Sequence, residues 1–168
     1  DLITQYQNHQ GLMGEDGRFF NARYITASAY SQLERYSDSL SILDKILSSE
    51  SLSEEERHKA LLQKAEVLIK SKQFEDALKL IDGMESQKTE IPAAEKPAAA
   101  KADSGRLIFL RAEAYYGMGE FDKSHLLYKQ IADEFQNSSF SDNALYNMAH
   151  VKKSQGDTKE AVEAFIRY

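Results

Sequence analysis

The side chains that could carry acid–base or metal chemistry are scattered along this sequence. Its four histidines, His9, His58, His125 and His150, lie far apart. His125 and Asp122 could share a helix face, but two ligands do not make a metal site. The chain has no cysteine, which excludes disulfides, thiolate nucleophiles and cysteine metal sites. We therefore expect no bound metal.

Sequence motifs for catalysis are also absent. The chain contains no H-E-x-x-H, no P-loop and no G-x-S-x-G. The glycine-rich stretch GLMGEDG at residues 11–17 does not match the dinucleotide fingerprint, and no strand precedes it, so it favours a loop between helices. The acids Glu54–Glu56 follow Ser53 with the spacing of a capping box, which predicts a helix start. We expect a protein without catalytic residues or cofactors.

Composition narrows the class of partner. The chain has 168 residues, 42% of them hydrophobic and 29% charged, with a formal net charge of -6. An acidic chain is a poor match for nucleic acid or an anionic membrane surface, which both favour basic patches. The longest aliphatic and aromatic run, LIFL at residues 107–110, is far shorter than the roughly 20 residues of a membrane span. We expect neither a nucleic-acid partner nor a transmembrane segment.

The sequence repeats one phrase four times, at intervals typical of a solenoid. Each phrase has an anchor position, occupied by Tyr36, Phe74, Phe121 and Thr158. Nine residues before the anchors stand Ala27, Ala65, Ala112 and Ala149, and three residues after them stand Ser39, Ala77, Ser124 and Ala161. Small side chains at such fixed offsets allow two helices to cross closely. Each phrase is therefore interpreted as a helical hairpin that stacks on its neighbours.

This pattern resembles the tetratricopeptide repeat over roughly residues 20–168. The matching residues of the best copy are Ala112, Tyr115, the turn Gly119–Phe121, Ser124 and Tyr128. The resemblance implies an all-α fold, a right-handed superhelix (α-solenoid) of helix-turn-helix hairpins. We predict about nine helices, including one at residues 1–7.

The repeats suggest a division of the chain. We predict the end of a preceding repeat and a loop at 1–17, repeats at 18–52, 53–85, 104–137 and 138–168, and an insertion at 86–103. The last repeat is predicted to be truncated and the chain to be a piece of a longer array. The insertion is rich in Ala, Pro, Lys and Glu and predicts a mobile surface loop. The alternative is that Pro97 opens an early turn of the next helix.

The resemblance also predicts a binding surface, because first helices of successive repeats line the concave face in this family. The residues in register there are Tyr24, Leu62, Phe109, Tyr116, Tyr146, Glu66, Glu113, His150 and Lys153. An aromatic and aliphatic stripe with polar flanks suits an extended peptide or a helix. The alternative is that these residues pack against the next repeat. Some family members hold a C-terminal carboxylate with Lys, Asn and Arg; here Ser28, Gln63 and Glu66 stand instead, so we do not expect that activity.

A second resemblance concerns location. The segment from residue 133 to 165 is similar to repeats of bacterial cell-envelope proteins, such as the Tol-Pal accessory protein and outer-membrane assembly lipoproteins. The shared residues are Phe135, Asn137, Ser138, Ala144, Leu145, Tyr146, Gly156, Ala161 and Phe165. This resemblance implies a periplasmic or envelope-associated protein. The sequence predicts a non-catalytic scaffold that binds a protein or peptide, with a structural, self-associating array as the alternative.

Overall fold

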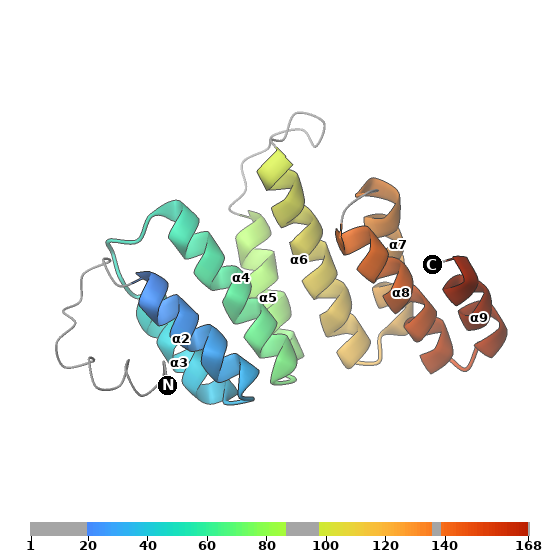
Figure 1. Ribbon diagram of the computed structural model, residues 1–168, viewed down its shortest axis with the longest axis horizontal. Helices are drawn as coiled ribbons and strands as arrows, with labels where there is room; N and C mark the ends of the chain where they lie inside the picture. The colour runs from blue at the N-terminus through green and yellow to red at the C-terminus, as the bar shows by residue number, and fades with distance from the viewer. Residues whose placement is uncertain (1–19, 87–97, 136–138, 168) are drawn as a thin grey trace. The chain divides into compact units, whose positions relative to one another are not determined.

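A computed structural model describes residues 20–86, 98–135 and 139–167 of the chain. These residues form helices and no strand, which confirms the all-α prediction for this part (Figure 1). The helices are α2 (Phe20–Gln32), α3 (Tyr36–Leu47), α4 (Glu54–Lys70), α5 (Phe74–Ser86), α6 (Ala98–Gly117), α7 (Phe121–Glu134), α8 (Ser139–Ser154) and α9 (Thr158–Arg167). These eight do not match the expected count of about nine. The helix expected at residues 1–7 lies outside the described residues.

The helices belong to two compact units, residues 1–73 and 74–168. In the first unit α2 packs on α3 and α3 on α4, and in the second each helix from α5 to α9 packs on the next. Helix α6 also contacts α8, as stacked hairpins require. Each unit is thus consistent with a solenoid, whereas the right-handed superhelix across the whole chain stays a prediction. None of the described helices is both long and apolar enough to cross a membrane.

The four turns that precede the anchor residues share one geometry. In each turn, the residue two before the anchor has a positive φ: Glu34 at 59°, Lys72 at 63°, Gly119 at 79° and Gly156 at 85°. The next residue donates its backbone N–H to a carbonyl five residues back, at 2.8–3.0 Å, in Arg35, Gln73, Glu120 and Asp157. This is the Schellman ending of an α-helix. The repeat register predicted from sequence is therefore confirmed at all four turns.

The predicted small residues occupy the interior. Ala27, Ala65, Ala112 and Ala149 are fully buried, and so are their counterparts Ser39, Ala77 and Ser124, with Ala161 nearly so. In the first hairpin the Ser39 hydroxyl donates to the Ala27 carbonyl at 2.8 Å, which shows how closely α2 and α3 approach. Larger side chains then fill the space beside the crossing, including Leu43 and Ile46 in the first unit and Tyr128 and Ile131 in the second.

The starts of α4 and α6 test two further expectations. Ser53 accepts the backbone N–H of Glu56, and the Glu56 carboxylate accepts the backbone N–H of Ser53 at 3.0 Å, so the predicted capping box is present. Helix α6 begins at Ala98. The last residues of the expected insertion at 86–103 are therefore helical, because a run of alanines has the highest helix propensity. This outcome favours the alternative of an early start, and residues 87–97 lie outside the described part.

Candidate binding pocket between three helices

A cavity of about 290 Å³ lies in the second unit, where α6, α7 and α8 meet. We call it the tyrosine pocket, and it is lined by Glu113, Tyr116, Tyr128, Tyr146, Asn147 and His150. Residues three or four apart on a helix share a face, which aligns Glu113 with Tyr116 and Tyr146 with His150. Four of the nine predicted binding residues therefore meet in one cavity.

A triangle of hydrogen bonds crosses this pocket. The Tyr128 hydroxyl donates to Glu113 Oε1, the Asn147 amide donates to the same oxygen, and the amide also donates to the Tyr128 hydroxyl, each at 3.2 Å. The three groups come from three different helices. The triangle therefore fixes the position of the Glu113 carboxylate relative to both neighbouring helices.

The electrostatics of the triangle follow from its burial. Loss of solvent raises the pKa of Glu113, and the hydrogen bonds from Tyr128 and Asn147 act in the opposite direction. Burial, and then the charge of Glu113, raises the pKa of Tyr128 well above its usual value, so the phenol remains a donor. Neither Lys nor Arg forms an ion pair with Glu113 in the part of the chain that the structure describes. The donors to its carboxylate among the described residues are neutral.

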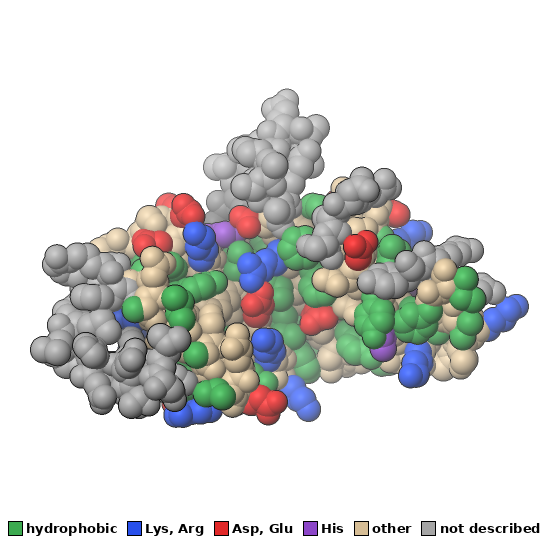
Figure 2. Space-filling view, viewed as in Figure 1, with side chains coloured by type: hydrophobic (Ala, Val, Ile, Leu, Met, Phe, Trp, Pro, Cys, Tyr) green, Lys and Arg blue, Asp and Glu red, His purple; other side chains and the backbone are tan. Residues whose placement is uncertain are grey.

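The mouth of the pocket is aromatic. Tyr116 is 37% exposed and Tyr146 is 45% exposed. The Tyr116 hydroxyl lies 2.9 Å from the Ser154 hydroxyl, and the Tyr146 ring contacts the rings of His150 and Phe165 with centroids 4.5 and 5.7 Å away. In the space-filling view, hydrophobic side chains gather over α8 and α9 (Figure 2). The two tyrosines are therefore held in place while part of each remains open to a partner.

The other predicted residues of the second unit have different surroundings. Phe109 is half-buried, and its ring meets Tyr128 edge-on at 5.6 Å and Phe140 at 6.4 Å. It packs against the core cluster that contains Ala112. Phe109 is therefore mainly a core side chain, whereas Lys153 is exposed on α8 beyond the pocket lining.

Three predicted residues belong to the first unit. Tyr24 is half-buried and stacks on Phe20 at 5.4 Å, and Glu66 is half-buried. Leu62 is only 3% exposed, so the expectation that it contacts a partner is wrong. A leucine is too short to reach solvent from this position, where a tyrosine in α8 does. The continuity of the stripe from this unit to the other stays a prediction.

Sequence reasoning did not assign polar roles to Tyr128 and Asn147. The sequence identifies Tyr128 only as a residue that matches the repeat. A buried tyrosine hydroxyl usually has a hydrogen-bond partner, and this rule points to polar groups on neighbouring helices. Within the described residues no group of three His, Asp or Glu side chains could hold a metal ion.

Comparisons with known proteins agree with the repeat pattern. Residues 142–168 match the family model described as tetratricopeptide repeat. No curated protein matches the sequence significantly. Among solved structures, MamA (residues 41 to the end) from Desulfovibrio magneticus RS-1 is 19% identical, with 98% of this chain and 78% of that chain covered, at a TM-score of 0.63.

A second similar structure is a putative kinesin light chain from Podosopora anserina with nearly identical TPR-like repeats. It is 16% identical, covers 98% of this chain and 79% of that one, and has a TM-score of 0.66. At such identities the likeness concerns the fold, and neither structure supports the envelope-lipoprotein type. The chain therefore has the fold of tetratricopeptide-like repeats, with a family match at residues 142–168.

Proposed function

We propose that this chain is a non-catalytic scaffold that binds a segment of another protein through its first helices. The observation that carries the proposal is the tyrosine pocket. Tyr116 and Tyr146, on α6 and α8, leave their rings partly open around a fixed carboxylate. Partly open aromatic side chains in a concave site are typical anchors for a partner.

The rigidity of the pocket supports a binding role. The Glu113 carboxylate, the Tyr116 hydroxyl and the Tyr146 ring each have a fixed partner within the second unit. A site whose side chains are already ordered loses less conformational entropy when a partner binds. Tetratricopeptide-like hairpins present such sites on a repeating framework, and a superhelix would extend the surface across both units.

A structural, self-associating array is the second candidate. It is favoured by α9, on which Val162 and Ile166 are exposed apolar side chains. If the array self-associates through this helix, Val162→Ser with Ile166→Ser will lower the mass measured by light scattering at high concentration. The resemblance of the segment at residues 133–165 supports a periplasmic or envelope location for either function.

The test of the scaffold is a double substitution, Tyr116→Ala with Tyr146→Ala. The tagged variant and the wild type are used to capture partners from an extract of the source cell, and recovery is quantified by mass spectrometry. We expect at least about a tenfold loss of a specific partner, because aromatic anchors contribute about 2 kcal/mol or more each. Leu126→Ala is the matched control, since Leu126 is 65% exposed on α7 and lies outside the pocket.

Two results would contradict this function. One is recovery equal to wild type from the double variant, with its circular dichroism and melting temperature unchanged. The other is an equal loss of partner in the Leu126→Ala control, which would place the contact on the second helices instead.

A further inference from the structure

We propose that the tyrosine pocket binds the guanidinium group of an arginine side chain. This inference deepens the proposed function and rests on it for the statement that the arginine belongs to a partner protein. The charge of the pocket, its size and the geometry of its aromatic rings together favour a guanidinium group as the ligand.

The negative charge of Glu113 favours a positively charged ligand in the pocket. Among the described residues of the lining, Glu113 is the only acidic side chain, and its two hydrogen-bond donors, Tyr128 and Asn147, are neutral. Both groups donate to Oε1 of Glu113, and no described residue donates to its Oε2. A half-buried carboxylate in this setting is stabilised most by a positively charged donor that reaches its second oxygen.

The arginine nearest in sequence does not serve this purpose. Arg111 lies two residues before Glu113, and residues two apart do not share a helix face. Its guanidinium instead contacts Asp82 and Glu85 on α5, at 2.6 and 2.8 Å. Since the carboxylates of α5 hold this side chain, Glu113 depends on a group from outside the described part of the chain for a charge partner.

The size of the pocket fits one side chain. Pockets for small molecules usually span about 300–1,000 Å³, and this one, at about 290 Å³, lies at the lower end. A single long side chain from an extended peptide is a suitable occupant. A whole helix is not, because the cavity is formed within three adjacent helices of one unit.

The aromatic mouth favours arginine over lysine. Tyr116 and Tyr146 are partly exposed at the mouth, and aromatic rings there can contact a planar cation, as guanidinium groups commonly do. The guanidinium is also weakly hydrated and presents several N–H donors in a fixed plane, so it can stack and reach Glu113 at once. A lysine ammonium is a compact, strongly hydrated charge and gains less from the rings.

The direct test is a peptide titration followed by NMR. The full chain, labelled with ¹⁵N, is titrated with acetyl-Gly-Arg-Gly-amide, with its citrulline counterpart and with its lysine counterpart. Citrulline keeps the planar group and removes the charge. We expect saturable shifts at Glu113, Tyr146 and Asn147 with a Kd on the order of 1 mM for arginine. Binding of the other two peptides should be at least about tenfold weaker.

Two variants sharpen the titration. Glu113→Gln keeps an oxygen that accepts from Tyr128 and Asn147, and it should reduce arginine affinity to the level of the citrulline peptide. Asp133→Asn removes one exposed negative charge from α7 outside the pocket, and it should bind like wild type. Retained dispersion in the amide spectrum establishes that each variant is folded.

The outcomes separate the two proposals. Equal affinity for arginine and citrulline, or an unaltered titration in Glu113→Gln, overturns the guanidinium site. Equal affinity for lysine overturns its specificity for arginine. If arginine binds as expected but Tyr116→Ala with Tyr146→Ala leaves partner capture intact, the proposed scaffold surface fails while the cation site stands.

Discussion

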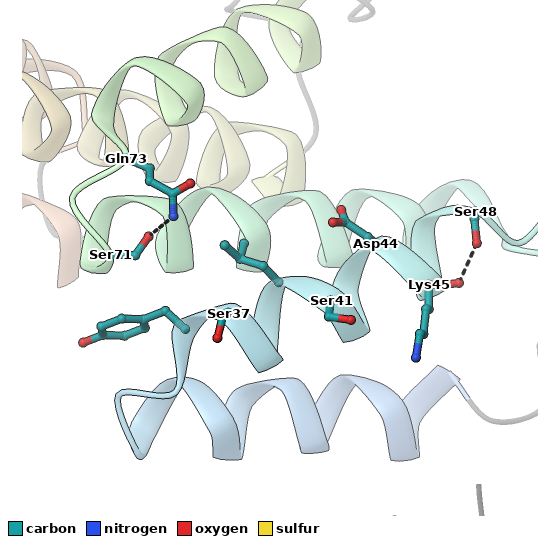
Figure 3. Close-up of a pocket in the computed structure, with 9 residues that line it drawn as sticks. Ser37, Ser41, Asp44, Lys45, Ser48, Ser71 and Gln73 are labelled. Carbon is teal, nitrogen blue, oxygen red and sulfur yellow. Dashed lines mark hydrogen bonds between the residues drawn. The ribbon is translucent and has the colours of Figure 1, made fainter. Parts of the chain in front are cut away.

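Two cavities of this chain show how little size says about binding. The first unit contains one of about 780 Å³ along α3, which we call the serine groove (Figure 3). It is lined by Tyr36, Ser37, Leu40, Ser41, Asp44, Lys45, Ser48, Ser71 and Gln73. The tyrosine pocket in the second unit has less than half of that volume. Yet we propose that the smaller cavity is the better binding site, for an electrostatic reason.

Four polar residues of the serine groove, Asp44, Ser48, Ser71 and Gln73, have side-chain partners within the first unit. Asp44 forms an ion pair with Lys64 at 2.6 Å. The Ser48 hydroxyl donates to the Lys45 carbonyl at 3.0 Å, and the Gln73 amide donates to the Ser71 hydroxyl at 2.8 Å (Figure 3). By contrast, the described partners of Glu113 are all neutral. We propose that a half-buried carboxylate among aromatic rings indicates a binding site better than cavity volume does.

The largest expected effect comes from breaking the framework of the tyrosine pocket. Ala112 is fully buried beside Tyr128 and Ile131. Ala112→Leu adds bulk at a helix crossing, and overpacking costs about 1–3 kcal/mol of unfolding free energy. We expect a clearly lower melting temperature and loss of arginine-peptide binding. Ala22→Leu on the exposed side of α2 is the control and should change stability little. An unaltered melting temperature in Ala112→Leu would remove Ala112 from the crossing.

A smaller effect is expected at the turns that precede the anchor residues, which occur in both units. Gly119 has φ 79°, and an added Cβ would meet no atom within 4 Å, so only backbone conformation opposes a side chain. Gly119→Ala should cost about 1–2 kcal/mol of unfolding free energy, measured by denaturant titration.

The reciprocal substitution is Lys72→Gly in the first unit, where φ is already 63°. Relief of the strained conformation is offset by the greater freedom that glycine gives the unfolded chain. The net change in unfolding free energy should stay within about 0.5 kcal/mol. A large loss in Lys72→Gly would show that the lysine side chain, rather than the turn, stabilises this position.

The turns and crossings could be predicted from sequence because they depend on local rules. Each copy needs small residues at a fixed distance from the turn, and this requirement is visible as spacing. Ala27 and Ser39 illustrate the success, since their offset from Tyr36 predicted the close contact found between α2 and α3. Even so, two of the four positive-φ positions hold Glu34 and Lys72, whose residue types do not favour that conformation.

The depth of a residue and its polar partners were harder to predict. Repeat register places Leu62 and Tyr146 on equivalent faces, but one is buried and the other is 45% exposed. The repeat register predicts the helix face on which a residue lies, whereas the exposed fraction of its side chain also depends on side-chain length and on neighbouring helices. The triangle of Glu113, Tyr128 and Asn147 joins three helices, so no single periodicity reveals it.

A modest effect of opposite sign is expected for Glu113→Gln. The pKa of Glu113 is raised in the folded chain, so the folded state binds the proton more readily than the unfolded state does. The ionised carboxylate therefore lowers stability above the folded pKa, and the wild type regains that stability as pH falls through it. We expect Glu113→Gln to melt at a higher temperature than wild type at neutral pH.

This difference in melting temperature should shrink as the pH falls through the raised pKa of Glu113 toward the usual value of a glutamate. Thermal melts of both proteins across an acidic-to-neutral pH series provide the check. A carboxylate retained at a cost in stability is expected where it serves binding. A lower melting temperature for Glu113→Gln at every pH would instead give Glu113 a structural role.

A small effect is also expected in the serine groove. Asp44 is largely exposed, and exposed ion pairs such as Asp44–Lys64 contribute only about 0.2–1 kcal/mol. A double-mutant cycle with Asp44→Asn and Lys64→Met should give a coupling free energy in that range, falling as salt is added. The same Asp44→Asn variant should bind the arginine peptide like wild type, because its charge is already compensated. If the arginine peptide shifts the signals of Asp44 and Lys45 as strongly as those of Glu113 and Asn147, the two cavities do not differ in the way proposed. In that case general electrostatic attraction to an acidic chain, rather than the tyrosine pocket, explains the binding.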